Sequence, residues 1–335
     1  MLKKLTTTVL LATLSFAGTQ EVNIYSHRHY DTDKQLYKMF EKETGIKVNV
    51  VKAKANELIK RLEIEGKNSP ADLLITSDAA RLHLAYKKNL LQSIDSDYLN
   101  KTVPNNLKQK DGYWYALTKR ARVIVYNKDK VNPSSLSTYA ALTSKNMKNK
   151  VLIRKASNIY NQSLLASIIA NKGEEEATKW AKDMVNNFAR TPKGSDRDQM
   201  KAVAAGVGDI AVVNTYYLGM LLNSNKKREV MVGKKMGIFF PNQNTTGTHI
   251  NISGVGVVKY SKNKKNAIKL IEFLVSPKAQ GLYAKTNFEY PINKNVEPSP
   301  LLKSWGSFKE DNLSLELLGQ NNEKAVKIFN IVGWN

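Results

Sequence analysis

The sequence predicts an α/β protein with two lobes, each a mostly parallel sheet flanked by helices, and a ligand cleft between the lobes. Its 335 residues are too many for one simple core and suit two domains of ordinary size. Hydrophobic residues make up 42% and charged residues 24% of the chain, which is typical of a soluble globular protein. Segments with strand and helix patterns also alternate along the chain, as they do in α/β folds.

The first half of the chain has a β-α-β-α-β pattern. Residues Glu21–Ser26 alternate in hydrophobicity as a strand does, and 31–44 carry apolar residues at helical spacing. Thr44-Gly45 ends that helix. The next elements are expected as a strand at 46–51, a helix at 56–65, a strand at 73–76 and a helix at 79–88. This order favours parallel strand pairing with helices on the sheet faces.

A second α/β region follows a β-rich segment at 120–127. Its expected elements are a strand at 151–154, a helix from about Gln162, a helix at 174–188, a strand at 209–214, a helix that begins at Thr215, a strand at 254–259, a helix at 264–275 and a largely helical tail from Ser299. No flexible linker separates the two regions, so we expect crossing strands to join the lobes. The expected lobes comprise 21–118 plus 249–298, and 119–248 plus 299–335.

The first 17 residues have the pattern of a cleavable export signal. Lys3 and Lys4 form a positive start, residues 5–17 are mostly apolar, and Ser15-Phe16-Ala17 puts small residues where signal peptidase cuts. The apolar run is too short to span a bilayer comfortably. The alternative is a buried N-terminal strand or helix. The prediction is a signal peptide at 1–17 and a mature protein outside the cytoplasm.

Composition excludes several kinds of site. The chain has no cysteine, so cysteine-ligated zinc, iron–sulfur clusters, thiol catalysis and a lipoprotein anchor are ruled out, and a metal must be held by oxygen and nitrogen atoms. The net charge is +23, which is compatible with nucleic acid as a ligand. However, the lysines are scattered and form no aromatic-studded basic stripe. We therefore predict no nucleic-acid partner and interpret the basic surface as one that docks to a membrane permease.

Signatures of catalysis are missing from the sequence. It contains no HExxH, GxSxG or Walker loop, and no GxGxxG after a strand. A secreted hydrolase with an unrecognised site is the alternative. The prediction is a binding protein and not an enzyme.

Three places after predicted strands carry candidate ligand side chains. They are His27 to Tyr30, Tyr160, and the pair Tyr216-Tyr217. Side chains beyond the carboxyl ends of strands point to where α/β proteins bind ligands. The chain has 15 tyrosines, and a single tyrosine is more often a packing residue; a sugar or peptide cleft would also use aromatic side chains. The shared position after strands favours a metal site.

Several long segments resemble the ferric-ion-binding periplasmic proteins, the iron-transport branch of the type II solute-binding superfamily. The segments are YSHRHYDTDKQLYKMFEKETGIKV, SPADLLITSDAARLHLAYKKNLLQ, KRARVIVYNK, AAGVGDIAVVNTYYLG and SGVGVVKYSKNKKNAIKLIEFLVSPKAQGLYAKTNFEYP. The resemblance implies a type II periplasmic binding protein fold that closes around its ligand by a hinge motion. It also implies a periplasmic monomer that carries Fe(III) to an ABC permease in the inner membrane.

The resemblance also implies a ligand set. The RHY motif supplies His29 and Tyr30, Tyr160 follows the second-lobe strand, and NTYY supplies Tyr216 and Tyr217. The branch that uses a histidine and several tyrosines without a carboxylate is the most similar one, so a synergistic anion is not required, and His29, an anion or water completes the coordination. Members differ on whether the histidine touches the metal.

Neighbouring residues extend this expected site. His27 replaces a more usual small polar residue, and either supports the ligands or has no role. Arg120 matches a family arginine near the metal, with Arg122 as the alternative; for both, a surface or hinge salt bridge is the competing interpretation.

Fe(III) chemistry agrees with such a site. Fe(III) prefers anionic oxygen ligands, and a nearby trivalent cation keeps a phenol, whose ordinary pKa is about 10, ionised at neutral pH. Four phenolates on one Fe(III) leave a net charge of −1, which a guanidinium offsets. The alternative ligand is a small organic or anionic solute such as a polyamine, thiamine or a phosphonate. Such a cleft would use carboxylates, aromatic cages or helix N-termini.

Overall fold

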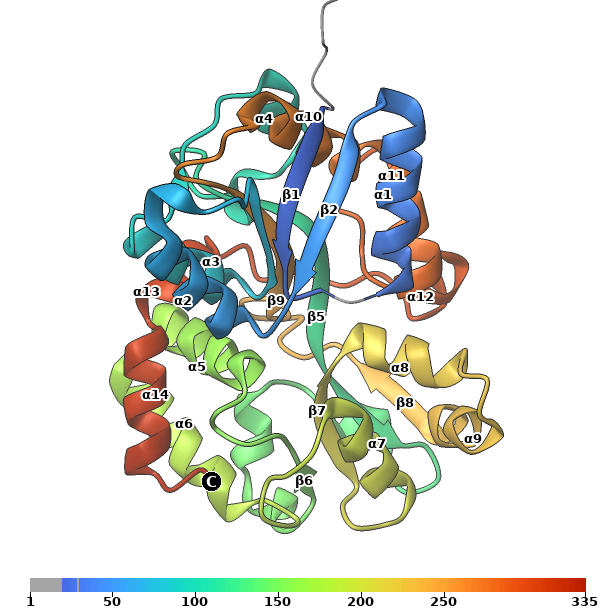
Figure 1. The fold of residues 1–335 in the computed structure, drawn as a ribbon. Helices are drawn as coiled ribbons and strands as arrows, with labels where there is room; N and C mark the ends of the chain where they lie inside the picture. The colour runs from blue at the N-terminus through green and yellow to red at the C-terminus, as the bar shows by residue number, and fades with distance from the viewer. Residues whose placement is uncertain (1–19, 29) are drawn as a thin grey trace, which may run out of the picture.

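Two α/β lobes make up the protein, one above the other in Figure 1. The structure is a computed structural model that describes residues 20–28 and 30–335. The predicted fold class, a two-lobed α/β protein, is confirmed. The predicted signal peptide at 1–17 and the candidate ligand His29 lie outside the described residues.

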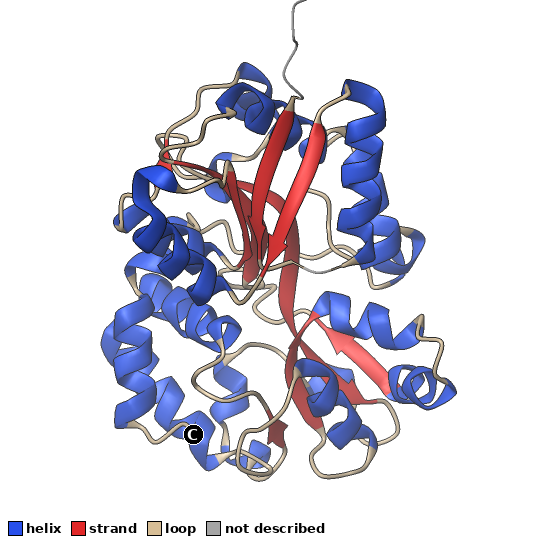
Figure 2. Cartoon of the chain, viewed as in Figure 1, coloured by secondary structure: helices blue, strands red, loops and turns tan. Residues whose placement is uncertain are grey.

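The first lobe is built on three parallel strands, β1 (Glu21–Ser26), β2 (Lys47–Lys52) and β3 (Leu73–Ser77), with β1 between the other two. Helices cover this sheet (Figure 2). They are α1 (Asp31–Thr44), α2 (Ala55–Glu65), α3 (Ala79–Lys87), α4 (Asp97–Thr102), α10 (Lys264–Val275) and α11 (Pro277–Leu282). The predicted bounds of α1 and α10 are confirmed, since each has a clear apolar face and α1 ends at Gly45 with φ +71°.

The second lobe contains the parallel pair β6 (Val151–Leu152) and β7 (Ile210–Asn214), with β8 (Met236–Phe239) beside β5. Its helices are α5 (Ile159–Lys172), α6 (Glu174–Asn186), α7 (Asp196–Ala204), α8 (Thr215–Leu222) and α9 (Lys227–Lys235). The sequence reasoning missed α7 and α9, which are short and highly charged. It also placed the start of α5 at about Gln162, three residues too late, because the cap is Asn158, whose Oδ1 accepts from the Tyr160 N–H at 3.2 Å.

Two long strands join the lobes, β5 (Tyr115–Asn127) and β9 (Ile250–Val258). β9 pairs antiparallel with β3 and with the first part of β5, up to Ala121; from Arg122 onward β5 pairs with β7 and β8. Figure 1 shows β5 running from one lobe into the other. Both strands begin earlier than predicted because polar residues such as Thr118 and Asn251 interrupt the apolar pattern although they are buried.

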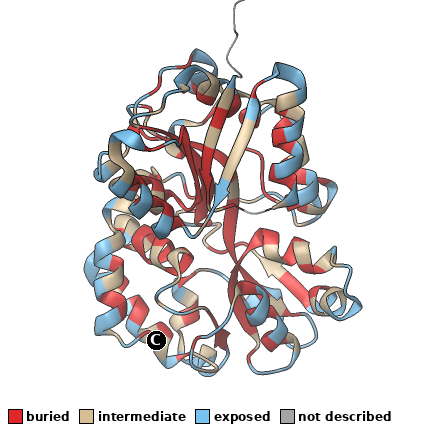
Figure 3. Ribbon diagram, in the orientation of Figure 1, coloured by how far each residue is buried: buried red, intermediate tan, exposed pale blue. Residues whose placement is uncertain are grey.

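The tail contains three helices, α12 (Pro300–Ser304), α13 (Glu316–Gln320) and α14 (Asn322–Ile331), with a non-helical connection between the first two. α13 packs on both α3 and α5, so it lies across the junction of the lobes. Burial is concentrated on the central strands and the inner faces of the helices (Figure 3). Within residues 20–28 and 30–335, no helix has the length and apolar character needed to cross a membrane.

Candidate metal centre

All four candidate tyrosines lie at the starts of helices. Tyr30 is the residue before α1, Tyr160 is the second residue of α5, and Tyr216 and Tyr217 are the second and third residues of α8. The N-terminus of a helix carries a partial positive charge, which stabilises anions nearby. These positions are therefore suited to phenolates.

The structure brings the four tyrosines together from both lobes. The hydroxyl oxygens of Tyr160 and Tyr216 are 3.4 Å apart. The ring of Tyr30 meets that of Tyr216 edge-on, with centroids 6.4 Å apart, and the rings of Tyr216 and Tyr217 are 4.1 Å apart. Tyr30, Tyr160 and Tyr217 line a cavity of about 240 Å³.

Burial makes three of these phenols hard to ionise without a cation. Desolvation is the largest cause that raises the pKa of Tyr30, Tyr216 and Tyr217, and neighbouring phenols raise it further. Without a cation, ionising one of these buried phenols costs free energy, so the hydroxyls stay neutral. A trivalent cation would invert the preference and favour the phenolates.

Arginines surround the tyrosine cluster. The guanidinium carbons of Arg120, Arg122 and Arg154 lie 5.4, 5.9 and 5.8 Å from the centre of the Tyr160 ring, and that of Arg28 lies 5.0 Å from the Tyr30 ring. Both arginines predicted as alternatives are thus near the cluster. Arg28 and Arg154 were not singled out from the sequence, although Arg28 lies inside the RHY motif.

Buried carboxylates lie close to three of these arginines. Arg28 pairs with Asp33 and Glu289, each at 3.0 Å, and Arg122 pairs with Asp196 at 2.9 Å. Arg120 donates to Ser253 at 2.9 Å and lies 3.9 Å from Glu289. Glu289 was not predicted as part of the site, and only its place inside the NFEYP sequence, at the end of the last segment that resembles the family, could have suggested it.

His27 lines the same cavity. Its Nδ1 lies 3.1 Å from Ser77 Oγ and 3.5 Å from an Arg81 nitrogen. These contacts hold His27 against the first lobe. They place it on the wall of the cavity that Tyr30, Tyr160 and Tyr217 also line.

Among the described residues, no group of three or more His, Asp or Glu side chains is arranged to hold a metal. Carboxylates and imidazoles therefore form no competing metal site in this part of the chain. A metal at the tyrosine cluster would therefore depend on phenol oxygens.

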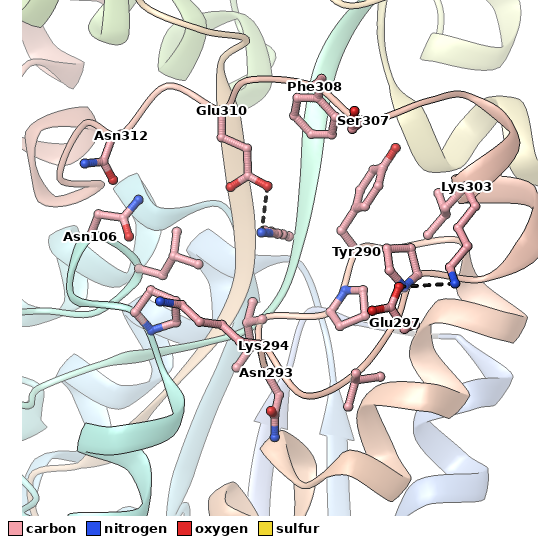
Figure 4. A pocket seen from close by; sticks show the side chains of 18 of the residues that line it. Asn106, Tyr290, Asn293, Lys294, Glu297, Lys303, Ser307, Phe308, Glu310 and Asn312 are labelled. Carbon is pink, nitrogen blue, oxygen red and sulfur yellow. Dashed lines mark ion pairs between the residues drawn. The ribbon is translucent and has the colours of Figure 1, made fainter.

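A larger cavity, of about 730 Å³, is lined by Lys119 of β5 and by residues of the segments 104–107 and 290–312 (Figure 4). Its wall includes Lys119, which pairs with Glu310 at 2.7 Å, and Lys303, which pairs with Glu297 at 3.1 Å. Because Lys119 and Arg120 are successive residues of β5, their side chains point to opposite faces of the strand. This cavity therefore faces away from the tyrosines, and its charged groups are largely paired, so size alone does not locate the functional site.

The chain belongs to the family of bacterial extracellular solute-binding proteins, which residues 35–310 match. Among its relatives, iron uptake protein A1 of Synechocystis is 49% identical over 94% of this chain and 88% of its own length. The major ferric iron-binding protein of Neisseria meningitidis is 29% identical, with 86% of each chain covered.

Solved structures agree with these relatives. A Trichodesmium protein, described as IdiA or FutA in complex with iron and citrate, aligns with a TM-score of 0.92 at 50% identity and covers 94% of this chain and 100% of its own. The ferric binding protein of Campylobacter jejuni aligns with a TM-score of 0.90 at 47% identity, with the same coverage. The resemblance to ferric-ion-binding proteins is therefore confirmed.

Proposed function

We propose that this protein captures Fe(III) between its lobes through the phenolates of Tyr30, Tyr160, Tyr216 and Tyr217, and delivers it to an ABC permease of the inner membrane. The observation that carries the proposal is the convergence of the four phenols from both lobes. His29 is proposed as the fifth ligand. The relatives named for iron uptake and ferric iron binding support the same cargo.

The surroundings favour a small, highly charged cation. Four phenolates leave Fe(III) with one excess negative charge, and the guanidinium of Arg120 lies close enough to offset it. The helix starts beneath Tyr160, Tyr216 and Tyr217 add partial positive charge. The cavity of about 240 Å³ is smaller than the roughly 300–1,000 Å³ common for organic ligands, which argues against a polyamine or thiamine.

The division of ligands between lobes suggests an order of binding. Tyr160, Tyr216 and Tyr217 belong to the second lobe, so iron would meet them first. Closure would then bring Tyr30 and His29 to the metal. The proposed lobes are 21–118 plus 249–298 and 119–248 plus 299–335, and we propose that the permease distinguishes the closed form from the open one.

Location follows from the family and from the N-terminal residues. Family members are extracellular solute-binding proteins, and we propose that residues 1–17 direct export and are removed. The mature protein is proposed to be a periplasmic monomer with no enzymatic activity, which binds iron without requiring a synergistic anion.

Visible absorption tests the proposal. Tyrosinate bound to Fe(III) absorbs visible light by charge transfer, so the pure protein should become coloured when ferric nitrilotriacetate is added. Tyr160→Phe and Tyr217→Phe should each weaken iron binding and shift the band, whereas Tyr260→Phe, at an exposed residue, should change neither. A wild-type protein that stays colourless and takes up no iron would refute the proposal.

A further inference from the structure

Phe288 has a strained backbone beside the metal centre. It directly follows a π-helical turn, Tyr283–Asn287, and lies in the left-handed region at φ +54° and ψ +31°. A bulky aromatic residue rarely adopts this conformation, and such strain persists only where the surroundings enforce it. π-helical turns are also frequent at functional sites.

Contacts on both sides of Phe288 enforce its conformation. Asn287 Nδ2 donates to the Glu289 carboxylate at 2.5 Å, and Glu289 is held by Arg28. The backbones of Tyr290 and Lys119 exchange hydrogen bonds of 2.8 and 3.0 Å. The segment is therefore fixed to the hinge strand β5.

The preceding turn is fixed to the first lobe. Thr286 Oγ1 lies 2.8 Å from Thr32 Oγ1 of α1, and the guanidinium of Arg28 lies 5.1 Å from the centre of the Tyr283 ring. Phe288 thus stands on a rigid first-lobe support.

From this support the side chain of Phe288 reaches α8 in the second lobe. A Cβ atom built on Gly219 would lie 2.6 Å from Phe288 Cγ and 2.7 Å from Phe288 Cβ, closer than such atoms approach each other. Only glycine at this position lets the ring lie directly on the helix. Gly219 is three residues after Tyr216, so it lies about one turn along the helix that carries Tyr216 and Tyr217.

We propose that Phe288 is a positioning residue for iron binding: its contact with Gly219 sets α8 where Tyr216 meets Tyr30 in the closed protein. The inference rests on the proposed function. The contact joins the two lobes, so opening the lobes would break it and leave the strained backbone without this partner. Closure of the lobes and correct placement of Tyr216 and Tyr217 therefore depend on the same contact.

Four variants of the full chain test this role: Gly219→Ala, Phe288→Ala, the double variant, and Gly281→Ala. Gly281 is the matched control because it is also a helical glycine, but a Cβ there would meet nothing within 4 Å. Each protein is loaded with ferric nitrilotriacetate. The measurements are the charge-transfer maximum, the rate of iron loss to a competing chelator, and the radius of gyration by X-ray scattering; thermal unfolding checks that each variant is folded.

Gly219→Ala is expected to release iron roughly tenfold faster, because the added methyl group overpacks the contact, with a shifted band and a less compact loaded form. Phe288→Ala, which lacks the contact, should also release iron faster than the wild type. The double variant should match Phe288→Ala, because the added methyl group then meets no ring, and Gly281→Ala should match the wild type. A folded Gly219→Ala protein with wild-type release and absorption overturns the inference, as does a folded Phe288→Ala protein with wild-type release. Failure of the wild type and Gly281→Ala to bind iron would instead refute the proposed function.

Discussion

At the scale of single residues, the site depends on how buried charges are paired. Arg120 and Arg122 both approach Tyr160, but their partners differ. Arg122 neutralises the buried Asp196 and has one nitrogen, Nε, without a partner among the described residues. Arg120 has two such nitrogens, Nε and Nη2. We therefore expect Arg122 to maintain the fold and Arg120 to offset the charge of a negatively charged metal complex.

Replacing these two arginines should separate stability from iron binding. Arg122→Met should cost roughly 3–5 kcal/mol of unfolding free energy, because Asp196 would be left buried without a counter-charge. Arg120→Met should cost much less stability, since Glu289 keeps Arg28 as a partner, and should weaken iron binding instead. Urea unfolding of the iron-free proteins and chelator competition measure the two effects. If Arg120→Met lowers the unfolding free energy more than Arg122→Met does, then Arg120 is the arginine that maintains the fold.

His249 should make the fold sensitive to acid. Burial, with Arg122 and Arg120 nearby, lowers the pKa of His249 to about 3, whereas an unfolded histidine has a pKa of about 6.5. The unfolded chain therefore binds more protons between these values, and stability falls as pH falls through this window. The loss approaches about 1.4 kcal/mol per pH unit.

Urea unfolding of iron-free protein at pH 7, 6 and 5 measures this loss. His249→Gln should flatten the dependence, whatever its stability at pH 7. If the slopes of the variant and the wild type coincide, His249 does not cause the acid sensitivity.

At the scale of elements, α3 and α5 meet across the lobes through one buried carboxylate. Asp78 caps α3, accepting from the Ala80 N–H at 2.9 Å. Its two carboxylate oxygens also accept from Ser163 Oγ of α5 at 2.7 and 2.9 Å, and Asn251 of β9 donates at 2.8 Å. One side chain thus links a first-lobe helix, a crossing strand and the helix that begins beside Tyr160.

Removing the Ser163 hydroxyl should weaken the closed state. A hydrogen bond to a charged group contributes about 1.5–3 kcal/mol, so Ser163→Ala should raise the dissociation constant for iron by about tenfold or more. Ser167→Ala is the matched control, because Ser167 lies one turn later in α5 and donates to the Leu164 carbonyl of its own helix. Equal affinities of the two variants, measured by chelator competition, would exclude a role for this contact in closure.

At the scale of the whole molecule, both crossing strands and the tail pass between the lobes, so we expect the lobes to move about a hinge at β5 and β9. Iron loading should make the protein more compact, with a radius of gyration of about 20 Å for a compact chain of this length. X-ray scattering of iron-free and iron-loaded protein measures the change. A radius that stays constant on loading would contradict closure by iron.

Export is a second prediction at this scale. Protein isolated from the periplasm should begin close to residue 18, because signal peptidase would cut after Ala17. Mass spectrometry of the N-terminal peptide measures the start. A periplasmic protein that keeps Met1 would show that these residues are not a cleavable signal.

The sequence by itself determined the alternation of strands and helices, the two-lobed class and the family. Local patterns carry this information: α1 and α10 have strong apolar faces, and their bounds could be predicted to the residue. Tyr30, Tyr160, Tyr216 and Tyr217 are candidates because each follows a predicted strand, and the resemblance to the ferric-ion-binding proteins implies them as ligands.

Only the tertiary structure decided what surrounds them. Arg28, Glu289 and Phe288 are brought together by contacts between segments more than 250 residues apart in the chain, as in the Arg28–Glu289 pair with a separation of 261, and no local pattern records such a pairing. The same holds for β5 and β9, whose polar residues look exposed in the sequence but are buried in the fold. Burial and charge pairing depend on what packs opposite a residue, and the fold alone determines that.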